Sequence, residues 1–380
     1  MIYADYNATA PIRPEAREAM LRALDVGANP SSVHRPGRQA RKALENARSQ
    51  VASSIRGLPQ DVVFTSGGTE AVALAINGVV RKLEANCTLL VSAIEHEASS
   101  QNAGMSGAPV ETVYVTQGGQ IDLNMLQERL ARWDMQRSGT PVLVLLLANN
   151  ETGVVQPVQE AADLVRDAGG VTICDGVQAL GKIPLNVSLL GADFLTLSAH
   201  KAGGPQGVGA LWMRSGAPLM PTVFGGGQER SLRSGTENLS GIAGFGAAAE
   251  AAVSQLGEMQ HLSIARDAME DRLISDAGVT VFGKNSTRLP NTSNFAYDGF
   301  KAETQVMAMD LAGVAVSSGS ACSSGKVKRS LVLSAMGAPD SLAECAIRTS
   351  YGWKSAHSDF ERTADAWLEA LRRRNMKETA

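Results

Sequence analysis

Between about residue 61 and residue 214 the chain alternates short apolar runs with stretches of helical pattern, and this alternation constrains the fold more than any other feature. The apolar runs cover residues 62–64, 88–92, 142–148, 171–174, 193–197 and 209–213. Most of their positions are apolar, as in strands of a mostly parallel sheet that helices cover on both faces. The pattern therefore predicts an α/β domain.

The pattern changes after residue 246. We expect an alanine-rich helix over 247–274, short strands over 279–282 and 292–296, and helices over 303–312 and 359–374. Because 380 residues exceed one ordinary core, two domains are expected. We assign residues 15–250 to a large domain and residues 1–14 with 251–380 to a smaller α+β domain.

Charge and composition exclude several classes of protein. Apolar residues make up 44% and charged residues 19%, which excludes a disordered chain. The net charge of -3 gives no drive toward nucleic acid or an anionic membrane. The longest apolar run, 141–148, is far shorter than the ~20 residues of a spanning helix, and residues 1–11 lack a basic export signal. We expect a cytoplasmic protein with no nucleic-acid or membrane partner.

The sequence contains four cysteines. Cys87, Cys174, Cys322 and Cys345 are too widely spaced for a CxxC redox motif or a zinc site, so no metal is expected. For Cys87 and Cys174 the simplest interpretation is a small buried residue. Cys322 differs because it lies among Ser, Gly and Ala in residues 317–325 and is followed by basic residues that favour a thiolate. It is a candidate nucleophile, although a free surface thiol fits the local sequence equally well.

A candidate phosphate site stands between the strand over 62–64 and an apolar helix. Gly68 and Thr69 lie in the segment 64–70, FTSGGTE. Backbone N–H groups at a helix start, together with a threonine hydroxyl, can bind a phosphate. The same residues suit an ordinary N-cap formed by Thr69.

Chemically active side chains follow two further strands. Ser198, His200 and Lys201 come after the strand over 193–197, and an amine there can react with an aldehyde, although a lysine on a surface turn is the simpler interpretation. Asp175, with Gln178 behind it, ends the strand over 171–174 and can hold a pyridinium nitrogen protonated. A lysine, an aspartate and a glycine-rich phosphate cradle are what pyridoxal 5'-phosphate (PLP) requires of a protein.

Two more residues are candidates at the same sheet edge or close to it. His96 follows the strand over 88–92 and can stack on a cofactor ring and move protons, although a histidine after a strand is more often an ordinary loop residue. Arg348 can bind a substrate carboxylate through two hydrogen bonds, or can form an ordinary salt bridge.

Together these residues resemble the class V branch of PLP-dependent transferases, and specifically the NifS/IscS-type cysteine desulfurases. The likeness covers nearly the whole chain in order. It is carried by residues 3–5, 7–9, 29–34, 65–70, 95–96, 149–153, 175, 178, 198–201, 233–236, 317–322 and 348. The resemblance implies PLP fold type I, with a mostly parallel sheet in the large domain, and a reaction that converts L-cysteine to L-alanine.

The resemblance also implies a role for each residue. Lys201 would hold the cofactor covalently, Asp175 would pair with its ring nitrogen, and Gln178 would reach its ring hydroxyl. His96 would be the ring-stacking acid and base, and Cys322 would take the sulfur as a persulfide.

Further contacts are implied at both ends of the site. Asn150, near the cofactor, and Arg348 would bind the substrate carboxylate. Thr236 would reach the site of the neighbouring subunit in a homodimer. The phosphate contacts would come from this residue and from Gly68, Thr69, Ser198 and His200.

The segment around Cys322 resembles the long-loop group, which serves iron–sulfur scaffold proteins directly, so such a scaffold or another sulfur acceptor is the expected partner. Two alternatives on the same fold stay open. One is a PLP-dependent aminotransferase or related lyase in which Cys322 is incidental, and the other is a selenocysteine lyase. A further hypothesis is a non-catalytic module that keeps the fold. Such a module would not need to retain Lys201, Asp175 and His96 together.

Overall fold

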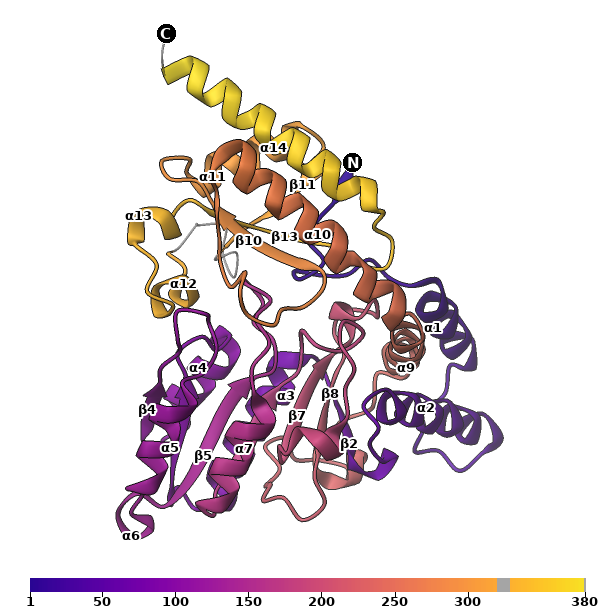
Figure 1. Ribbon diagram of the computed structural model, residues 1–380. Helices are drawn as coiled ribbons and strands as arrows, with labels where there is room; N and C mark the ends of the chain where they lie inside the picture. The colour runs from indigo at the N-terminus through magenta and orange to yellow at the C-terminus, as the bar shows by residue number, and fades with distance from the viewer. Residues whose placement is uncertain (320–328, 379–380) are drawn as a thin grey trace.

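The computed structural model describes residues 1–319 and 329–378, and it is a mixed α/β structure built on a large central sheet (Figure 1). The sheet has seven strands in the order β2-β8-β7-β6-β5-β3-β4. The run from β7 to β4 is parallel, whereas β8 is antiparallel to both of its neighbours. Its strands are β2 (Val62–Thr65), β3 (Cys87–Ser92), β4 (Val110–Val113), β5 (Thr140–Leu146), β6 (Val171–Asp175), β7 (Phe194–Ser198) and β8 (Gly209–Met213).

The mostly parallel sheet predicted from the apolar runs is confirmed, because each run forms a strand within about two residues of its expected bounds. Strand β4 was not predicted. It lies at the edge of the sheet, where Val110 is exposed and Val113 is buried, so it lacks the continuous apolar run of its neighbours.

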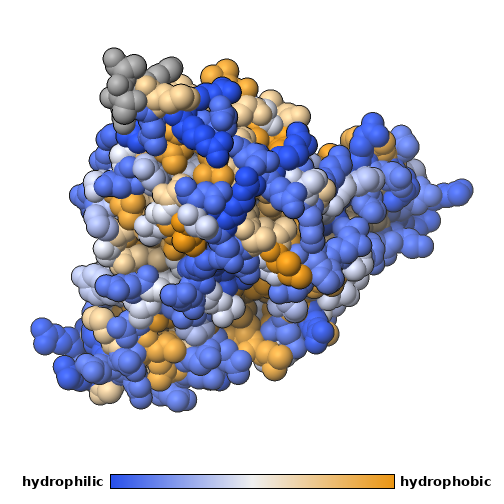
Figure 2. All heavy atoms as spheres, turned by 45° about the horizontal axis from the view of Figure 1, so that its top comes forward, coloured by the Kyte–Doolittle hydropathy of each residue, from blue (hydrophilic) through white to orange (hydrophobic). Residues whose placement is uncertain are grey.

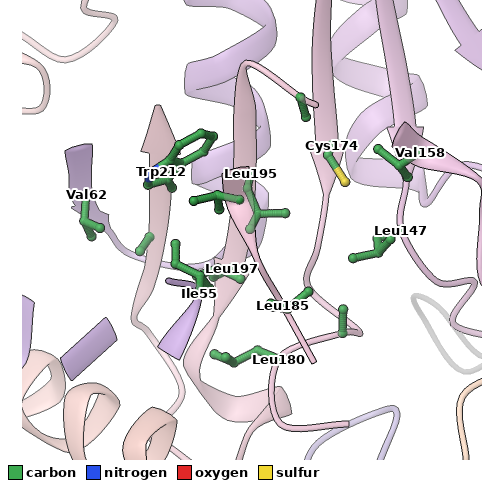
Figure 3. Close-up of a cluster of buried hydrophobic side chains, with 14 of the residues drawn as sticks. Ile55, Val62, Leu147, Val158, Cys174, Leu180, Leu185, Leu195, Leu197 and Trp212 are labelled. Atoms are coloured by element: carbon green, nitrogen blue, oxygen red, sulfur yellow. The ribbon is translucent and has the colours of Figure 1, made fainter. Parts of the chain in front are cut away.

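Helices cover both faces of the central sheet. Helix α3 packs on one face, and α2, α5, α7 and α9 contribute to the core on the other face. Figure 3 shows part of this second core, where Cys174 and Leu195 lie among other buried side chains. The helices are α1 (Pro14–Val26), α2 (Arg35–Ser54), α3 (Gly68–Lys82), α4 (Glu97–Met105), α5 (Leu123–Ala131), α6 (Met135–Ser138), α7 (Val158–Asp167), α8 (Val187–Leu190) and α9 (Leu239–Ser254).

A smaller antiparallel sheet, in the order β12-β13-β10-β9, lies above the central sheet in Figure 1. Its core is centred on Trp367, which contacts the rings of Phe295 and Phe300. The N-terminal strand β1 (Ile2–Tyr3) joins this part through parallel pairing with β11 (Val314–Ala315). The other elements are β9 (Thr280–Val281), β10 (Thr292–Ala296), β12 (Ser317–Ser318), β13 (Ala346–Ser350), α10 (Leu256–Ala277), α11 (Ala302–Leu311), α12 (Leu331–Ala335), α13 (Asp340–Ala343) and α14 (His357–Glu378).

The single helix predicted over 247–274 is wrong. The chain forms two helices, α9 and α10, which meet at Gln255, where the backbone leaves the helical region with φ -104° and ψ 14°. The side chain of Gln255 accepts a hydrogen bond from Arg13 Nη1 at 2.5 Å. This contact with a residue 242 positions away in the chain gives the junction a tertiary partner that the local helical pattern does not contain.

Apolar residues are distributed over the helices and the surface without an extended apolar face in the view of Figure 2. No helix in the described ranges is both long and apolar enough to cross a membrane. On the face shown in Figure 2, apolar residues form separate small patches among hydrophilic ones.

Candidate active site

A cavity of about 290 Å³ lies at the carboxyl edge of the central sheet and reaches β13 of the smaller sheet. The carboxyl ends of parallel strands are where α/β folds build their ligand sites. All the predicted site residues except Thr236 and Cys322 line this cavity: Gly68, Thr69, His96, Asn150, Asp175, Gln178, Ser198, His200, Lys201 and Arg348.

One end of the cavity is formed by the start of α3. The N-cap is Gly67 and it provides no side-chain cap, so the interpretation of Thr69 as an ordinary capping residue is wrong. A Cβ atom added to Gly68 would lie 2.8 Å from Val177 Cγ2 and 3.3 Å from Ser198 Cβ. Only glycine fits this close approach of the helix start to the end of β7, and the arrangement suits a phosphate.

Lys201 lies in a short 3-10 turn directly after β7. Its Nζ donates hydrogen bonds to the backbone carbonyls of Asn7, at 2.5 Å, and Ala8, at 2.9 Å. The N-terminal segment therefore orients the amine within the cavity.

His200, the neighbour of Lys201, lies with Nδ1 3.2 Å from Thr9 Oγ1. Burial, with a smaller effect of the Lys201 charge, lowers the pKa of His200 to about 4. The ring is therefore neutral at physiological pH, and it contributes a hydrogen bond rather than a charge to this wall.

Asp175 is the last residue of β6 and is held by two donors. Its Oδ1 accepts hydrogen bonds from the Val177 N–H at 3.0 Å and from Thr196 Oγ1 at 3.1 Å. Glu95 lies close by, because it accepts a 2.6 Å hydrogen bond from the N–H of Leu146, the β5 residue in register with Asp175. Burial, with a smaller effect of the Asp175 charge, raises the pKa of Glu95 well above its usual value. Burial therefore favours the neutral form of Glu95, and Asp175, which ends β6 in the cavity wall, is the carboxyl group placed to pair with a ring nitrogen.

His96 is the N-cap of α4 and lines the cavity. Its Nδ1 accepts a 3.0 Å hydrogen bond from the Ala98 N–H. Because Nδ1 is an acceptor, the neutral ring carries its proton on Nε2.

Arg348 projects from β13, and its side chain is only 3% exposed. Its Nη2 donates to Asp5 Oδ1 at 2.6 Å and its Nη1 to the Asn150 carbonyl at 3.0 Å. The buried Nε has no partner within the described residues. Because Arg348 lines the cavity, its guanidinium is a group in the wall that can bind a carboxylate.

Gln178 lines the cavity, but both ends of its amide already have partners. Nε2 donates to the Asn7 carbonyl at 3.0 Å, and Oε1 accepts from Lys182 Nζ at 2.5 Å. Thr236 lies outside the cavity, in a separate hollow beside Arg233. Cys322 lies outside the described residues.

Two residues that shape the site, Asn7 and Lys182, were not predicted as site residues. Asn7 appeared only within the segment that carries the family resemblance, although its carbonyl accepts hydrogen bonds from both Lys201 and Gln178. The sequence contains no signal for Lys182, because a lysine after a glycine looks like a surface residue until the fold shows that it is 4% exposed.

Comparisons with known proteins agree with this geometry. The family model described as "Aminotransferase class-V" matches residues 2–362. The chain is 38% identical to "Cysteine desulfurase IscS" of Dictyoglomus turgidum over 96% of this chain and 93% of that protein. It is 37% identical to "Cysteine desulfurase IscS 1" of Archaeoglobus fulgidus, over 95% and 94%. A solved structure titled "NIFS-LIKE PROTEIN" superposes with a TM-score of 0.89 at 30% identity, covering 98% of this chain and 99% of that one.

Proposed function

The chain belongs to the aminotransferase class-V family and to its IscS/NifS-type cysteine desulfurases, and we propose that it converts L-cysteine to L-alanine and passes the sulfur through Cys322 to an iron–sulfur scaffold or another acceptor protein. One observation carries the assignment of the site. A lysine, an aspartate, a histidine and a glycine-lined helix start, which are far apart in the sequence, converge on one cavity that an arginine also lines.

The cofactor is PLP, which when bound acts as an electron sink for the bonds around the amino acid's α-carbon. The residues present fit it. Lys201 supplies the amine that holds the aldehyde, and Gly68, Thr69, Ser198 and His200 supply a phosphate end without a cation. Asp175 supplies the carboxylate for the ring nitrogen, because it lines the cavity whereas Glu95 does not.

Lys201 and His96 are the residues we assign to proton movement. The carbonyls of Asn7 and Ala8 orient the Lys201 amine, so that it can take up or release a proton at Nζ. The Ala98 N–H occupies Nδ1 of His96, which leaves Nε2 as the nitrogen that can donate a hydrogen bond or a proton. The two groups reach the cavity from different strands, β7 and β3.

Arg348 and Asn150 are the residues we assign to the substrate carboxylate. Arg348 is held in place by Asp5 and by the Asn150 carbonyl, and its Nε has no partner in the described part of the chain. A fixed guanidinium recognises a carboxylate by geometry as well as by charge. Binding the carboxylate at β13 would orient the amino group toward the edge of the central sheet.

Cys322 is assigned as the sulfur acceptor, and the other three cysteines support this by their surroundings. Cys87, Cys174 and Cys345 are buried, and burial raises the pKa of each thiol. Thiols of this kind are poor nucleophiles because the thiolate is the reactive form. In the proposed transfer the substrate C–S bond breaks, the sulfur becomes bound to the Cys322 sulfur, and the remaining three-carbon amino acid takes up a proton to give alanine.

We further propose a homodimer with shared sites. The support is the position of Thr236, which lies beside Arg233 in a separate hollow and not in the cavity of its own chain. Sedimentation of a fully active monomer would contradict the shared site.

We also propose that the protein works in the cytoplasm, because its described cysteines are unpaired, as in reducing compartments. The division into residues 15–250 and residues 1–14 with 251–380 stays our assignment of domains.

The test is a comparison of two variants by visible absorbance and alanine release. Lys201→Ala should lose the absorbance of covalently held PLP and all turnover, while Lys284→Ala, an exposed lysine, should retain both. Cys322→Ser should bind PLP and cysteine and release neither alanine nor sulfide, since a hydroxyl is a poor nucleophile toward sulfur. Its control, Cys87→Ala, should turn over normally. Full turnover in Cys322→Ser would favour an aminotransferase or another lyase.

A further inference from the structure

A second lysine lies directly behind the cavity wall. Lys182 is 4% exposed, and its Nζ donates hydrogen bonds to Asn7 Oδ1 at 2.8 Å and to Gln178 Oε1 at 2.5 Å. It does not line the cavity. Its two acceptors do, so Lys182 acts on the site only through them.

The turn after β6 brings Lys182 inward, and Gly181 makes this turn possible. Gly181 has φ +73°, and a Cβ atom there would lie 2.5 Å from Ala252 Cβ of α9. A larger residue would separate the turn from α9. The inward position of Lys182 therefore depends on the backbone of this turn.

Burial, and to a smaller extent the nearby charges, favour an uncharged amine at Lys182. Burial lowers the pKa of Lys182 well below its usual value, and the charges of Lys201 and Arg348 lower it further. A neutral amine has two N–H donors. They match the two side-chain acceptors, Asn7 Oδ1 and Gln178 Oε1.

An amide side chain can present either its oxygen or its nitrogen, and its partners decide which. Lys182 Nζ donates to Gln178 Oε1, so Nε2 of the same amide points the other way. Nε2 indeed donates to the Asn7 carbonyl, the same oxygen that receives Lys201 Nζ. The Asn7 amide is fixed in the same way, with Oδ1 on Lys182 and Nδ2 on the Asn150 carbonyl and Thr292 Oγ1.

We propose that Lys182 is a positioning residue that holds Gln178 with its N–H donor, and not its oxygen, on the cavity side. A donor there stabilises an ionised ring hydroxyl of PLP, whereas a rotated amide would present an oxygen and repel it. The inference rests on the proposed function, because it assigns Gln178 to the ring hydroxyl. It adds a residue outside the cavity whose effect passes through Gln178.

The experiment titrates the visible absorbance of bound PLP with pH in wild type, Lys182→Met, Gln178→Ala and the double variant. Lys182→Met keeps an unbranched side chain but removes both donors. We expect the pKa obtained from the absorbance of bound PLP to rise by about one pH unit in this variant, because one hydrogen bond to an ionised oxygen is lost. Gln178→Ala should give a similar rise, and the double variant should rise no further than Gln178→Ala. Lys284→Met, in which an exposed lysine is replaced, should titrate as wild type.

The outcomes separate this inference from a packing role and from the proposed function. Additive shifts, or a Lys182→Met variant that melts at a lower temperature but titrates as wild type, would overturn it. If Lys182→Met does not fold, Lys182→Gln is used, which keeps an N–H donor. The pKa shift of Lys182→Gln should be smaller than that of Gln178→Ala. Adding Lys182→Gln to Gln178→Ala should cause no further shift, and a further shift would refute the inference. If wild type shows no absorbance of bound PLP, the proposed function itself fails.

Discussion

Replacing Arg348 with lysine tests the carboxylate site, because the change keeps the positive charge and removes the planar group. The guanidinium uses Nη1 and Nη2 on the Asn150 carbonyl and Asp5 Oδ1, and its Nε is buried without a partner in the described ranges. A lysine has a single nitrogen for all of these directions. It cannot keep both protein contacts and also form a paired contact with a carboxylate.

The expected cost follows from the hydrogen bonds lost. A hydrogen bond to a charged group contributes about 1.5–3 kcal/mol, so losing one from the substrate carboxylate lowers kcat/KM by roughly 10- to 150-fold. The carboxylate takes no part in the bonds that change, so we expect it to be bound equally strongly before and during the reaction. The loss should therefore appear mainly as a higher KM.

Alanine release is measured against cysteine concentration in wild type, Arg348→Lys and Arg288→Lys. Arg288 is a matched control: its side chain is also 3% exposed and is paired with a carboxylate, Glu270, but it does not line the cavity. Arg288→Lys should lower stability and leave KM unchanged. A KM of Arg348→Lys within about threefold of wild type would contradict the assignment of Arg348 to the carboxylate, because that difference is well below one charged hydrogen bond.

Two further changes test the surroundings of the site. Burial raises the pKa of Glu151 to about 7, from 4.5, so its protonated form contributes stability that is complete below pH 4.5 and is lost as the pH rises through 7. Glu151→Gln should therefore remove up to about 3 kcal/mol of that pH-dependent loss of stability. Denaturant unfolding of wild type and variant at pH 5 and pH 8 would detect the change. The same pH dependence of stability in both proteins would contradict the prediction. In the smaller core, Trp367 Nε1 donates to buried Gln305 Oε1 at 2.7 Å. Trp367→Phe should cost about 1–3 kcal/mol in unfolding experiments with alanine release retained, and a loss of activity without a loss of stability would count against this purely structural role.

The sequence was informative where one element alone decides the structure. A strand buried on both faces must be apolar along its length, so the central strands could be predicted, and the side chains that follow them had to meet at one edge. The sequence was uninformative where a contact between two distant segments determines the local structure. The break at Gln255 is accompanied by a contact from Arg13, and the burial of Lys182 depends on the turn at Gly181 packing against α9. No local pattern records either contact.

The geometry of the site also depends on a segment that belongs to neither sheet. Asp5 pairs with Arg348, while the Asn7 carbonyl accepts from Lys201 and the Asn7 N–H donates to Ser350 Oγ of β13. These few residues therefore connect the arginine assigned to the substrate carboxylate with the lysine assigned to the cofactor. A shift of one sheet against the other would move Arg348 relative to Lys201 only by breaking these bonds. A site that must hold a substrate at two ends gains its precision from this connection, because misplacement by about 1 Å can cost a hundredfold in rate.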